Sequence, residues 1–387
     1  MPAAPPDPSA APVREALRIG AGLDAVTVSG LTGEERDEVL RSWSRCGVET
    51  VELTEDADAH RGPEHPRSWL DWHENLVFLA TSRAIESARG THLMFHAACL
   101  AAPDTGAAIV LTAASGTGKT TATRRLGPHY AYLTDETAMV DPADLSVTPY
   151  PKPLSLLEPG GSRPKTQRGP DELGLGPTRA DAVLARIAVL DRVREAAAPV
   201  PARAEPMDVV TALQHLVPQT SSLSLLPRGL VALCTLLDAL GGVQRLVYAE
   251  ADDLRPVIDG LLAAAPQPVD PAWEPLDAAE LAASEGAAEP GAVRRAAVAD
   301  GILATDGRLV LLAGTTLTVL EGIGPAVWFA LESPLTPERI VARLAEDGPV
   351  PADAAERVAE AVAALESAGL LVTTPQGAGP EADALRS

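Results

Sequence analysis

The stretch Ala107-Ala-Ile-Val-Leu-Thr-Ala-Ala-Ser-Gly-Thr-Gly-Lys-Thr-Thr121 decides the fold of this chain. Its first half is an apolar run that predicts a buried strand, and the small residues that follow predict a turn. Lys119 and Thr120 then stand at the start of a predicted helix. Backbone N–H groups, a helix N-terminus and a lysine converge at this point, which is the layout of a phosphate-binding loop. The stretch therefore predicts a nucleoside triphosphate site in a domain of the α/β class.

The loop departs from the G-x-x-x-x-G-K-[ST] consensus at one place. Ala113 stands where the first glycine is expected, and alanine has fewer backbone conformations than glycine. The alternative is a glycine turn that merely joins a strand to a helix. We expect Thr120 to offer its hydroxyl to Mg²⁺, and we expect the nucleotide to be bound by Ser115, Gly116, Thr117, Gly118, Lys119, Thr120 and Thr121.

The formal net charge of −22 argues against binding to nucleic acid or to anionic membranes, because both require basic surfaces. The N-terminus lacks the basic and apolar segments of a signal peptide, and no apolar run approaches the ~20 residues that span a bilayer. The three cysteines have no metal-type spacing, so we expect a reduced, cytoplasmic protein. Hydrophobic residues make up 46%, enough for a sizeable core in two or three domains.

Composition and turn signals divide the chain. We expect a disordered tail at 1–12, a nucleotide-binding domain at 13–265, a Pro/Ala/Glu-rich linker at 266–292, a small α+β domain at 293–373 and a second tail at 374–387. A strand is expected at 93–101, a buried strand broken by an acidic pair at 129–140, and a long mobile loop at 158–179.

An acidic pair follows the apolar strand after the phosphate loop. Phosphoryl transfer requires Mg²⁺ against the phosphates and a carboxylate that accepts the proton of the nucleophile. We assign Asp135 as the base and Glu136 as a metal ligand; the alternative is a pair of solvated turn carboxylates. His96 lies near the phosphates if its strand ends at the same edge of the sheet, and otherwise it is structural.

The order and spacing of four segments resemble HPr kinase-like proteins, the serine kinases related to bacterial HPr kinase/phosphorylase. They are Phe95-His96-Ala97-Ala98, Ser115 to Thr121, Tyr132-Leu-Thr-Asp-Glu-Thr137 and Pro149-Tyr-Pro-Lys-Pro-Leu154. The resemblance covers roughly residues 75–265. It implies a phosphate-loop fold like that of HPr kinase and PEP carboxykinase, with ATP or GTP and Mg²⁺ as cofactors.

The same resemblance implies that His96 lies by the phosphates, that Asp135 is the catalytic base and that Glu136 assists the metal. The chain departs from the family at Ala113 and at Glu136, where the family has a second Asp. It also lacks the C-terminal signature of HPr kinase, so HPr is not the expected substrate. Lys152 contacts phosphate or the acceptor peptide, or else it faces solvent.

Residues 293–373 resemble a PqqD-like domain, in which a β-hairpin precedes three helices in a winged-helix-like arrangement. The hairpin is Ile302 to Leu312 with Asp306-Gly307 at its turn, and Asp353 with Glu356 indicates a capping box. Such domains bind leader peptides at a sheet edge. DNA binding is the rival interpretation, and the acidic residues Asp347, Glu356, Glu360 and Glu366 weigh against it.

Together these features favour a kinase that transfers the γ-phosphate of ATP to a Ser or Thr of a peptide, held by its leader on the C-terminal domain. Tethering raises the local concentration of the acceptor. Two alternatives stay open: a non-catalytic nucleotide-binding adaptor, and a small-molecule kinase. The acceptor, the choice between ATP and GTP, a reverse phosphorylase reaction and the oligomeric state all remain open.

Overall fold

The computed structural model describes residues 14–53, 59–63, 68–114, 118–157, 161, 163–194 and 200–375. The predicted tail at 1–12, and that at 374–387 beyond residue 375, lie outside them. The chain is a mixed α/β protein with several sheets, and it divides into two compact units. Unit 1 contains residues up to 207, with 219–221 and 243–267; unit 2 contains 208–218, 222–242 and the chain from 268 onward.

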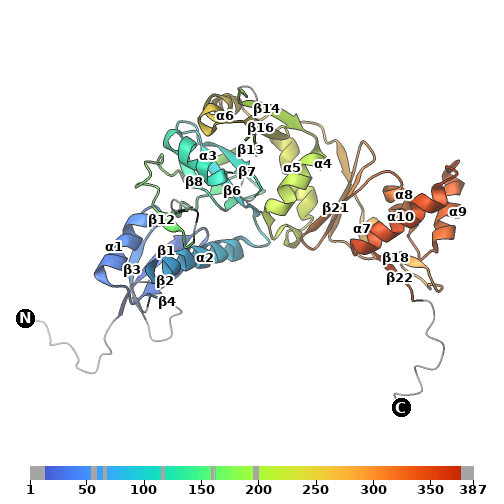
Figure 1. Cartoon of the computed structure of the whole chain (residues 1–387), viewed down its shortest axis with the longest axis horizontal. Coiled ribbons are helices and arrows are strands. Elements are labelled where there is room, and N and C mark those ends of the chain that lie inside the picture. Colours follow the sequence, from blue (N-terminus) through green and yellow to red (C-terminus); the bar gives the residue numbers. More distant parts are fainter. Residues whose placement is uncertain are drawn as a thin grey trace, which may run out of the picture. The chain divides into compact units, whose positions relative to one another are not determined.

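A six-stranded mixed sheet carries the predicted phosphate-loop segment in unit 1 (Figure 1). Its strands are, in order, β14 (Arg203–Met207), β16 (Val243–Tyr248), β13 (Val183–Arg192), β7 (Ala107–Thr112), β6 (Ala97–Ala101) and β8 (Ala131–Thr134). Strand β13 runs parallel to both β7 and β16, whereas β6 runs antiparallel to β7 and β8. Apolar residues of α3 (Lys119–Leu126) and α6 (Leu254–Ala263) pack into one core with this sheet.

Two of the predicted strands are each divided between two sheets. The segment 93–101 forms β5 (Leu93–Phe95) and β6, and the segment 129–140 forms β8 and β9 (Ala138–Val140). Strands β5 and β9 belong to a second sheet with β10 (Val147–Thr148) and β15 (Thr220–Ser221). The two neighbouring segments therefore change sheet together, which periodicity along one segment does not reveal.

The N-terminal part of unit 1 is a sheet with helices beside it. Its strands are, in order, β3 (Glu49–Leu53), β1 (Arg14–Ala21), β2 (Asp24–Ser29) and β4 (His60–Arg61). Helix α1 (Gly33–Ser42) begins after the N-cap residue Thr32, which forms a capping box with Glu35. Helix α2 (Trp69–Ala88) buries Leu76, Ala80 and Ala84 in the core with this sheet. In the predicted loop 158–179, β12 (Thr166–Arg168) pairs with β11 (Leu154–Leu156).

Unit 2 contains a four-stranded antiparallel sheet with several helices. The sheet order is β17 (Trp273–Pro275), β19 (Asp300–Ala304), β20 (Leu309–Ala313) and β21 (Thr316–Leu320), and β19–β20 is the predicted hairpin. A separate pair joins β18 (Val293–Arg295) to β22 (Leu371–Thr373). The helices are α4 (Val209–Leu216), α5 (Gly229–Ala239), α7 (Ala278–Leu281), α8 (Gly324–Ala330), α9 (Pro337–Asp347) and α10 (Ala354–Ser367).

Two local predictions in unit 2 differ from the structure. The segment 266–292, expected as a linker, contains β17 and α7, because Trp273 is buried and Asp277 caps α7 in a capping box with Glu280. The capping box predicted at Asp353 does not form. Its carboxylate instead accepts from Nε of Arg357 at 2.9 Å, one helical turn further on.

His73 on α2 makes the stability of unit 1 dependent on pH. The ring is 2% exposed, its Nε2 accepts a hydrogen bond from Trp43 Nε1 at 3.1 Å, and burial lowers the pKa of His73 to about 4. The native state therefore favours the neutral ring. We expect up to about 3 kcal/mol of stability, present above the unfolded-state pKa near 6.5, to be lost as the pH falls towards 4. Urea unfolding across this range measures the loss.

His73→Phe tests the assignment, because Phe fills the same space and has no charge to acquire. Its unfolding free energy should be flatter between pH 6.5 and 4 than that of the wild type. A variant with an unchanged pH slope would show that other groups cause the dependence.

Candidate active site

The three functional segments predicted from the sequence meet at one edge of the six-stranded sheet. Because β6 is antiparallel to both neighbours, its first residue lies beside the last residues of β7 and β8: Ala97 pairs with Thr112, and Cys99 with Thr134. His96, which precedes β6, therefore lies near the loop after β7 and the acidic pair after β8. The N–H of Ala97 also donates to the carbonyl of Glu136 at 3.0 Å.

The phosphate-loop segment joins β7 to α3 through Gly118. Gly118 has φ +106°, a conformation that side chains rarely adopt, and it directly precedes the first turn of α3. Ala113 is 2% exposed and is not among the described residues with positive φ, so alanine fits that position without strain. The predicted ligands Ser115, Gly116 and Thr117 lie outside the described residues.

A cleft of about 960 Å³ in unit 1 contains all the other predicted site residues. The residues that line it include His96, Gly118, Lys119, Thr120, Thr121, Asp135 and Glu136. A second wall comes from α2, where Phe78 is 74% exposed, and a third from Ser155 to Leu157. Arg163 and Lys165 complete the rim; Glu74 on α2 accepts from the guanidinium of Arg163 and the backbone N–H of Lys165, each at 3.1 Å.

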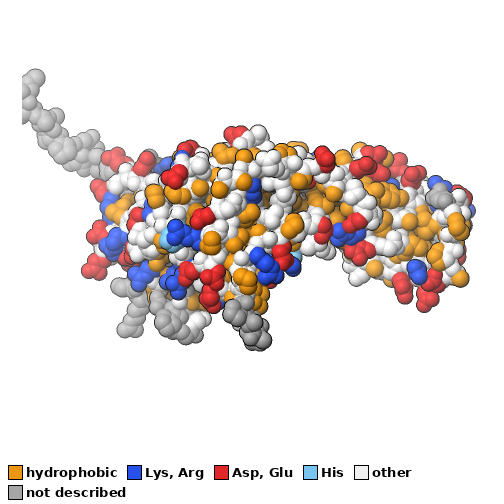
Figure 2. Space-filling model, turned by 90° about the horizontal axis from the view of Figure 1, so that it is seen from above, with side chains coloured by type: hydrophobic (Ala, Val, Ile, Leu, Met, Phe, Trp, Pro, Cys, Tyr) orange, Lys and Arg blue, Asp and Glu red, His pale blue; other side chains and the backbone are white. Residues whose placement is uncertain are grey.

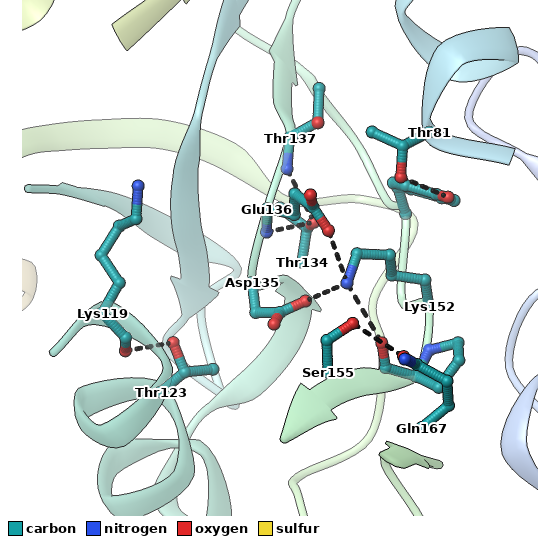
Figure 3. A network of polar contacts seen from close by, with 12 residues as sticks. Thr81, Lys119, Thr123, Thr134, Asp135, Glu136, Thr137, Lys152, Ser155 and Gln167 are labelled. Carbon is teal, nitrogen blue, oxygen red and sulfur yellow. Dashed lines mark hydrogen bonds and ion pairs between the residues drawn. The ribbon is translucent and has the colours of Figure 1, made fainter. Parts of the chain in front are cut away.

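A buried lysine contacts both carboxylates of the acidic pair (Figure 3). The ammonium of Lys152 lies 3.0 Å from Oδ1 of Asp135, 2.8 Å from Oε2 of Glu136 and 3.1 Å from the carbonyl of Pro153. Lys152 has no exposed surface, so it neither faces solvent nor reaches a ligand in the cleft. The hydroxyl of Tyr132 donates to the same Oδ1 of Asp135 at 3.0 Å.

These contacts favour the charged forms of Lys152 and Glu136. Burial alone would lower the pKa of Lys152, but the charges of Asp135 and Glu136 outweigh it and raise that pKa. The ammonium in turn lowers the pKa of the Glu136 carboxyl. Burial and then the charge of Asp135 raise the pKa of the Tyr132 hydroxyl, which stays a donor. A buried lysine is stable as a cation only with such partners.

His96 and Lys119 both line the cleft and are in contact with each other. The ammonium of Lys119 donates to the backbone carbonyl of His96 at 2.8 Å. Burial lowers the pKa of Lys119 to about 8, although the carboxylates of Glu136 and Asp135 oppose the shift. Burial and the charge of Lys119 also lower the pKa of His96, which favours the neutral imidazole. The cleft therefore presents the ammonium of Lys119 beside an imidazole ring whose neutral form is favoured.

Sequence reasoning missed Lys152 as a partner of the acidic pair and missed the α2 wall. The prolines on either side of Lys152 indicated only an extended segment. Phe78 lies on the solvent side of an amphipathic helix. A single exposed aromatic residue there creates no periodic sequence pattern that would mark it as functional.

Two properties of the described residues bear on ligands. No group of three or more His, Cys, Asp or Glu side chains among them is placed to hold a metal ion alone. No helix within the same residues has the length and apolarity needed to cross a bilayer. On the face drawn in Figure 2, blue and red side chains are interspersed without a continuous basic patch, in keeping with the net charge of −22.

Comparisons with known proteins add little to this geometry. No family model matches the chain, and no curated protein matches it. Among solved structures, it is similar to the HPr(Ser) kinase/phosphatase from Coxiella burnetii, with 13% identity and a TM-score of 0.24. That likeness covers 44% of this chain and 93% of the other. The function must therefore be argued from the cleft itself.

Replacement of Gly118 by alanine tests whether the loop conformation serves the ligand. A Cβ at Gly118 meets no atom within 4 Å, so the cost is backbone strain, about 1–2 kcal/mol. Gly174→Ala is the matched control, because Gly174 also has positive φ and open space but does not line the cleft. Both variants should lose stability in urea, and only Gly118→Ala should also lose affinity for ATP by calorimetry. Equal ATP affinities would contradict a role for Gly118 in binding.

Proposed function

We propose that unit 1 is an ATP-dependent phosphotransferase that acts on a hydroxyl group. The observation that carries the proposal is the single cleft lined by Lys119 at the start of α3 and by the carboxylates of Asp135 and Glu136. A helix N-terminus and a lysine stabilise phosphate oxygens, and an adjacent carboxylate accepts a proton. ATP is the proposed nucleotide, with GTP as the alternative.

Asp135 is the proposed base. Its Oδ1 is occupied by Lys152 and Tyr132, which leaves Oδ2 as the oxygen that accepts the proton of the acceptor hydroxyl. The hydroxyl oxygen then forms a bond to the γ-phosphorus, and the bond from that phosphorus to the β–γ bridging oxygen breaks as ADP leaves. Lys119 balances negative charge on the phosphoryl oxygens during transfer. His96, as a neutral ring, donates or accepts a hydrogen bond beside them.

The residues present fit Mg²⁺ as the metal. Mg²⁺ is usually bound by one or two carboxylates together with phosphate oxygens and water, rather than by an all-protein cage. Glu136 and Thr120 both line the cleft and offer such oxygens, and the described residues form no larger ligand cluster. When bound, Mg²⁺ supplies positive charge to the phosphates.

A peptide is the proposed acceptor, and the α2 wall supports it. Phe78 and Leu157 are 74% and 53% exposed on the same cleft. Figure 3 places Thr81 of α2 across the acidic pair from Lys119, so that the base lies between the phosphate end and this wall. An acceptor hydroxyl reaches Asp135 from that side, with an apolar neighbour packed on Phe78.

In unit 2, we propose that residues 293–373 bind a leader peptide of a ribosomally made precursor. Strand β21 supports this, because it lies at the end of its sheet with β20 as neighbour, and most of its side chains are at least partly exposed. Such an edge accepts an extended peptide as a further strand. The PqqD-like resemblance of this segment is the other support.

The principal alternative is a non-catalytic adaptor, and its sequence support is Ala113 in place of the first loop glycine. Ala113 is not among the described residues with positive φ, so this position does not require glycine. The alanine therefore does not by itself argue against turnover. A small-molecule kinase is separated from the peptide kinase by its product, which would be a phosphorylated metabolite formed without peptide.

Asp135→Asn and Lys119→Ala test the phosphotransferase. Asp135→Asn should bind ATP but transfer phosphate about 10²–10⁴-fold more slowly, since it loses the base. Lys119→Ala should lose ATP affinity. Transfer from radiolabelled ATP to a serine-centred peptide library, with Mg²⁺, measures both. Asp104→Asn, in the exposed turn at the other end of the β6–β7 hairpin, is the control. An active Asp135→Asn protein would exclude Asp135 as the base.

Phe78→Ala tests the acceptor wall. Truncation of this exposed side chain removes apolar contact with the peptide, so KM for the preferred library peptide should rise up to about tenfold. KM for ATP should not change. Leu70→Ala, an exposed apolar residue of the same helix that does not line the cleft, is the control. A rise in KM for ATP alone would assign Phe78 to the nucleobase instead.

A further inference from the structure

The chain contains only three lysines among its 31 cationic residues, and all three belong to this one site. Lys119 and Lys165 line the cleft, and Lys152 is buried against the acidic pair. Elsewhere the chain uses arginine. Lysine is a compact point charge with three donors, whereas arginine is a planar fork. The distinction matters for Lys152, whose surroundings are closed.

The ammonium of Lys152 is fully satisfied by acceptors that converge on one point. Its three donors match three oxygens: Oδ1 of Asp135 at 3.0 Å, Oε2 of Glu136 at 2.8 Å and the carbonyl of Pro153 at 3.1 Å. Figure 3 shows the side chain of Lys152 ending between the two carboxylates. With no exposed surface, Lys152 acts only through the residues it contacts.

We propose that Lys152 is the positioning residue of the phosphotransfer site, which holds the two carboxylates side by side and selects the oxygen of Asp135 that meets the acceptor. This inference rests on the proposed function and extends it. Among the described residues, both side-chain contacts to Asp135 go to Oδ1, one from Lys152 and one from Tyr132. Oδ2 is thereby left to the cleft.

The geometry also explains how two adjacent carboxylates stay in place. Without a cation between them they repel each other and separate, or one of them takes up a proton. The ammonium joins one oxygen of each and leaves the other oxygen of each for a different partner. A guanidinium is too wide to bring three donors to the same point, so arginine should not replace this lysine.

Amine acylation of the wild-type protein tests whether Lys152 is buried and whether the two carboxylates hold it there. With three lysines and the N-terminal amine, peptide mass spectrometry can follow each group separately. Acetylation under native conditions should modify Lys119 and Lys165 and spare Lys152. The double variant Asp135→Asn/Glu136→Gln should expose Lys152 to the reagent. Equal labelling of Lys152 and Lys165 in the wild type, or continued protection in the double variant, would overturn the proposal.

Kinetics separate positioning from a merely structural role. Lys152→Met should bind ATP within about threefold of the wild type, while its kcat on the peptide library falls about 10²-fold or more, as after loss of the base itself. Lys152→Arg should not restore kcat. Arg186→Met is the matched control: Arg186 is another buried cation of unit 1, held by backbone carbonyls away from the cleft, and kcat should be unchanged. A folded Lys152→Met protein with normal kcat would overturn the proposal.

A double-mutant cycle covers the case in which Lys152→Met alone does not fold. Lys152→Met/Glu136→Gln removes a cation and an anion together, so it restores the charge balance and should fold. If Lys152 acts through the pair, the double variant should be no slower than the slower single variant. Multiplicative losses would contradict this. A wild-type protein that binds ATP but transfers no phosphate would remove the proposed function, while the labelling result would still decide whether the acidic pair holds Lys152.

Discussion

The pairing of β6 with β7 on one side and β8 on the other is the constraint on which the site depends. The partners Ala97–Thr112 and Cys99–Thr134 bring the start of one strand to the ends of the other two. His96, the residues at the start of α3 and the acidic pair thus reach one edge from three separate stretches of sequence. Because side chains alternate along a strand, a slip of one residue would turn the inward-facing residues of β6 to its opposite face.

The change of sheet at this edge creates the space for chemistry. Between β8 and β9 the backbone leaves the ladder, and the hydroxyl of Thr134 accepts from the N–H groups of Glu136 and Thr137, both at 3.2 Å. These two hydrogen bonds satisfy backbone N–H groups that no longer take part in strand pairing. His96 lies at the equivalent break between β5 and β6, where its N–H donates to the carbonyl of Gln219 at 2.6 Å. Side chains at such breaks point along the sheet edge into the cleft.

The sequence predicted what local patterns determine. The strand before the loop and the helix from Lys119 are confirmed, since periodicity and turn residues suffice to define them. That Asp135 and His96 share a cleft followed only from order and resemblance. The burial of Lys152 was not predicted, because its partners come from a strand end seventeen positions earlier and proline spacing gives no sign of them. In unit 2, a prediction from local sequence was wrong at Asp353. The pattern predicted a helix cap, but the carboxylate accepts a hydrogen bond from Arg357 instead.

The buried ammonium reconciles two demands that conflict in an acidic chain. In the proposed reaction the triphosphate and the carboxylate that acts as base are both negative, and two unit charges 4 Å apart in a protein-like medium repel by about 4 kcal/mol. Lys119 and Lys165 offset this from within the cleft, where they occupy the ligand's space. Lys152 offsets it from behind the carboxylates and leaves the cleft open. The proposed base can therefore remain close to an anionic substrate without a further exposed cation behind the carboxylates.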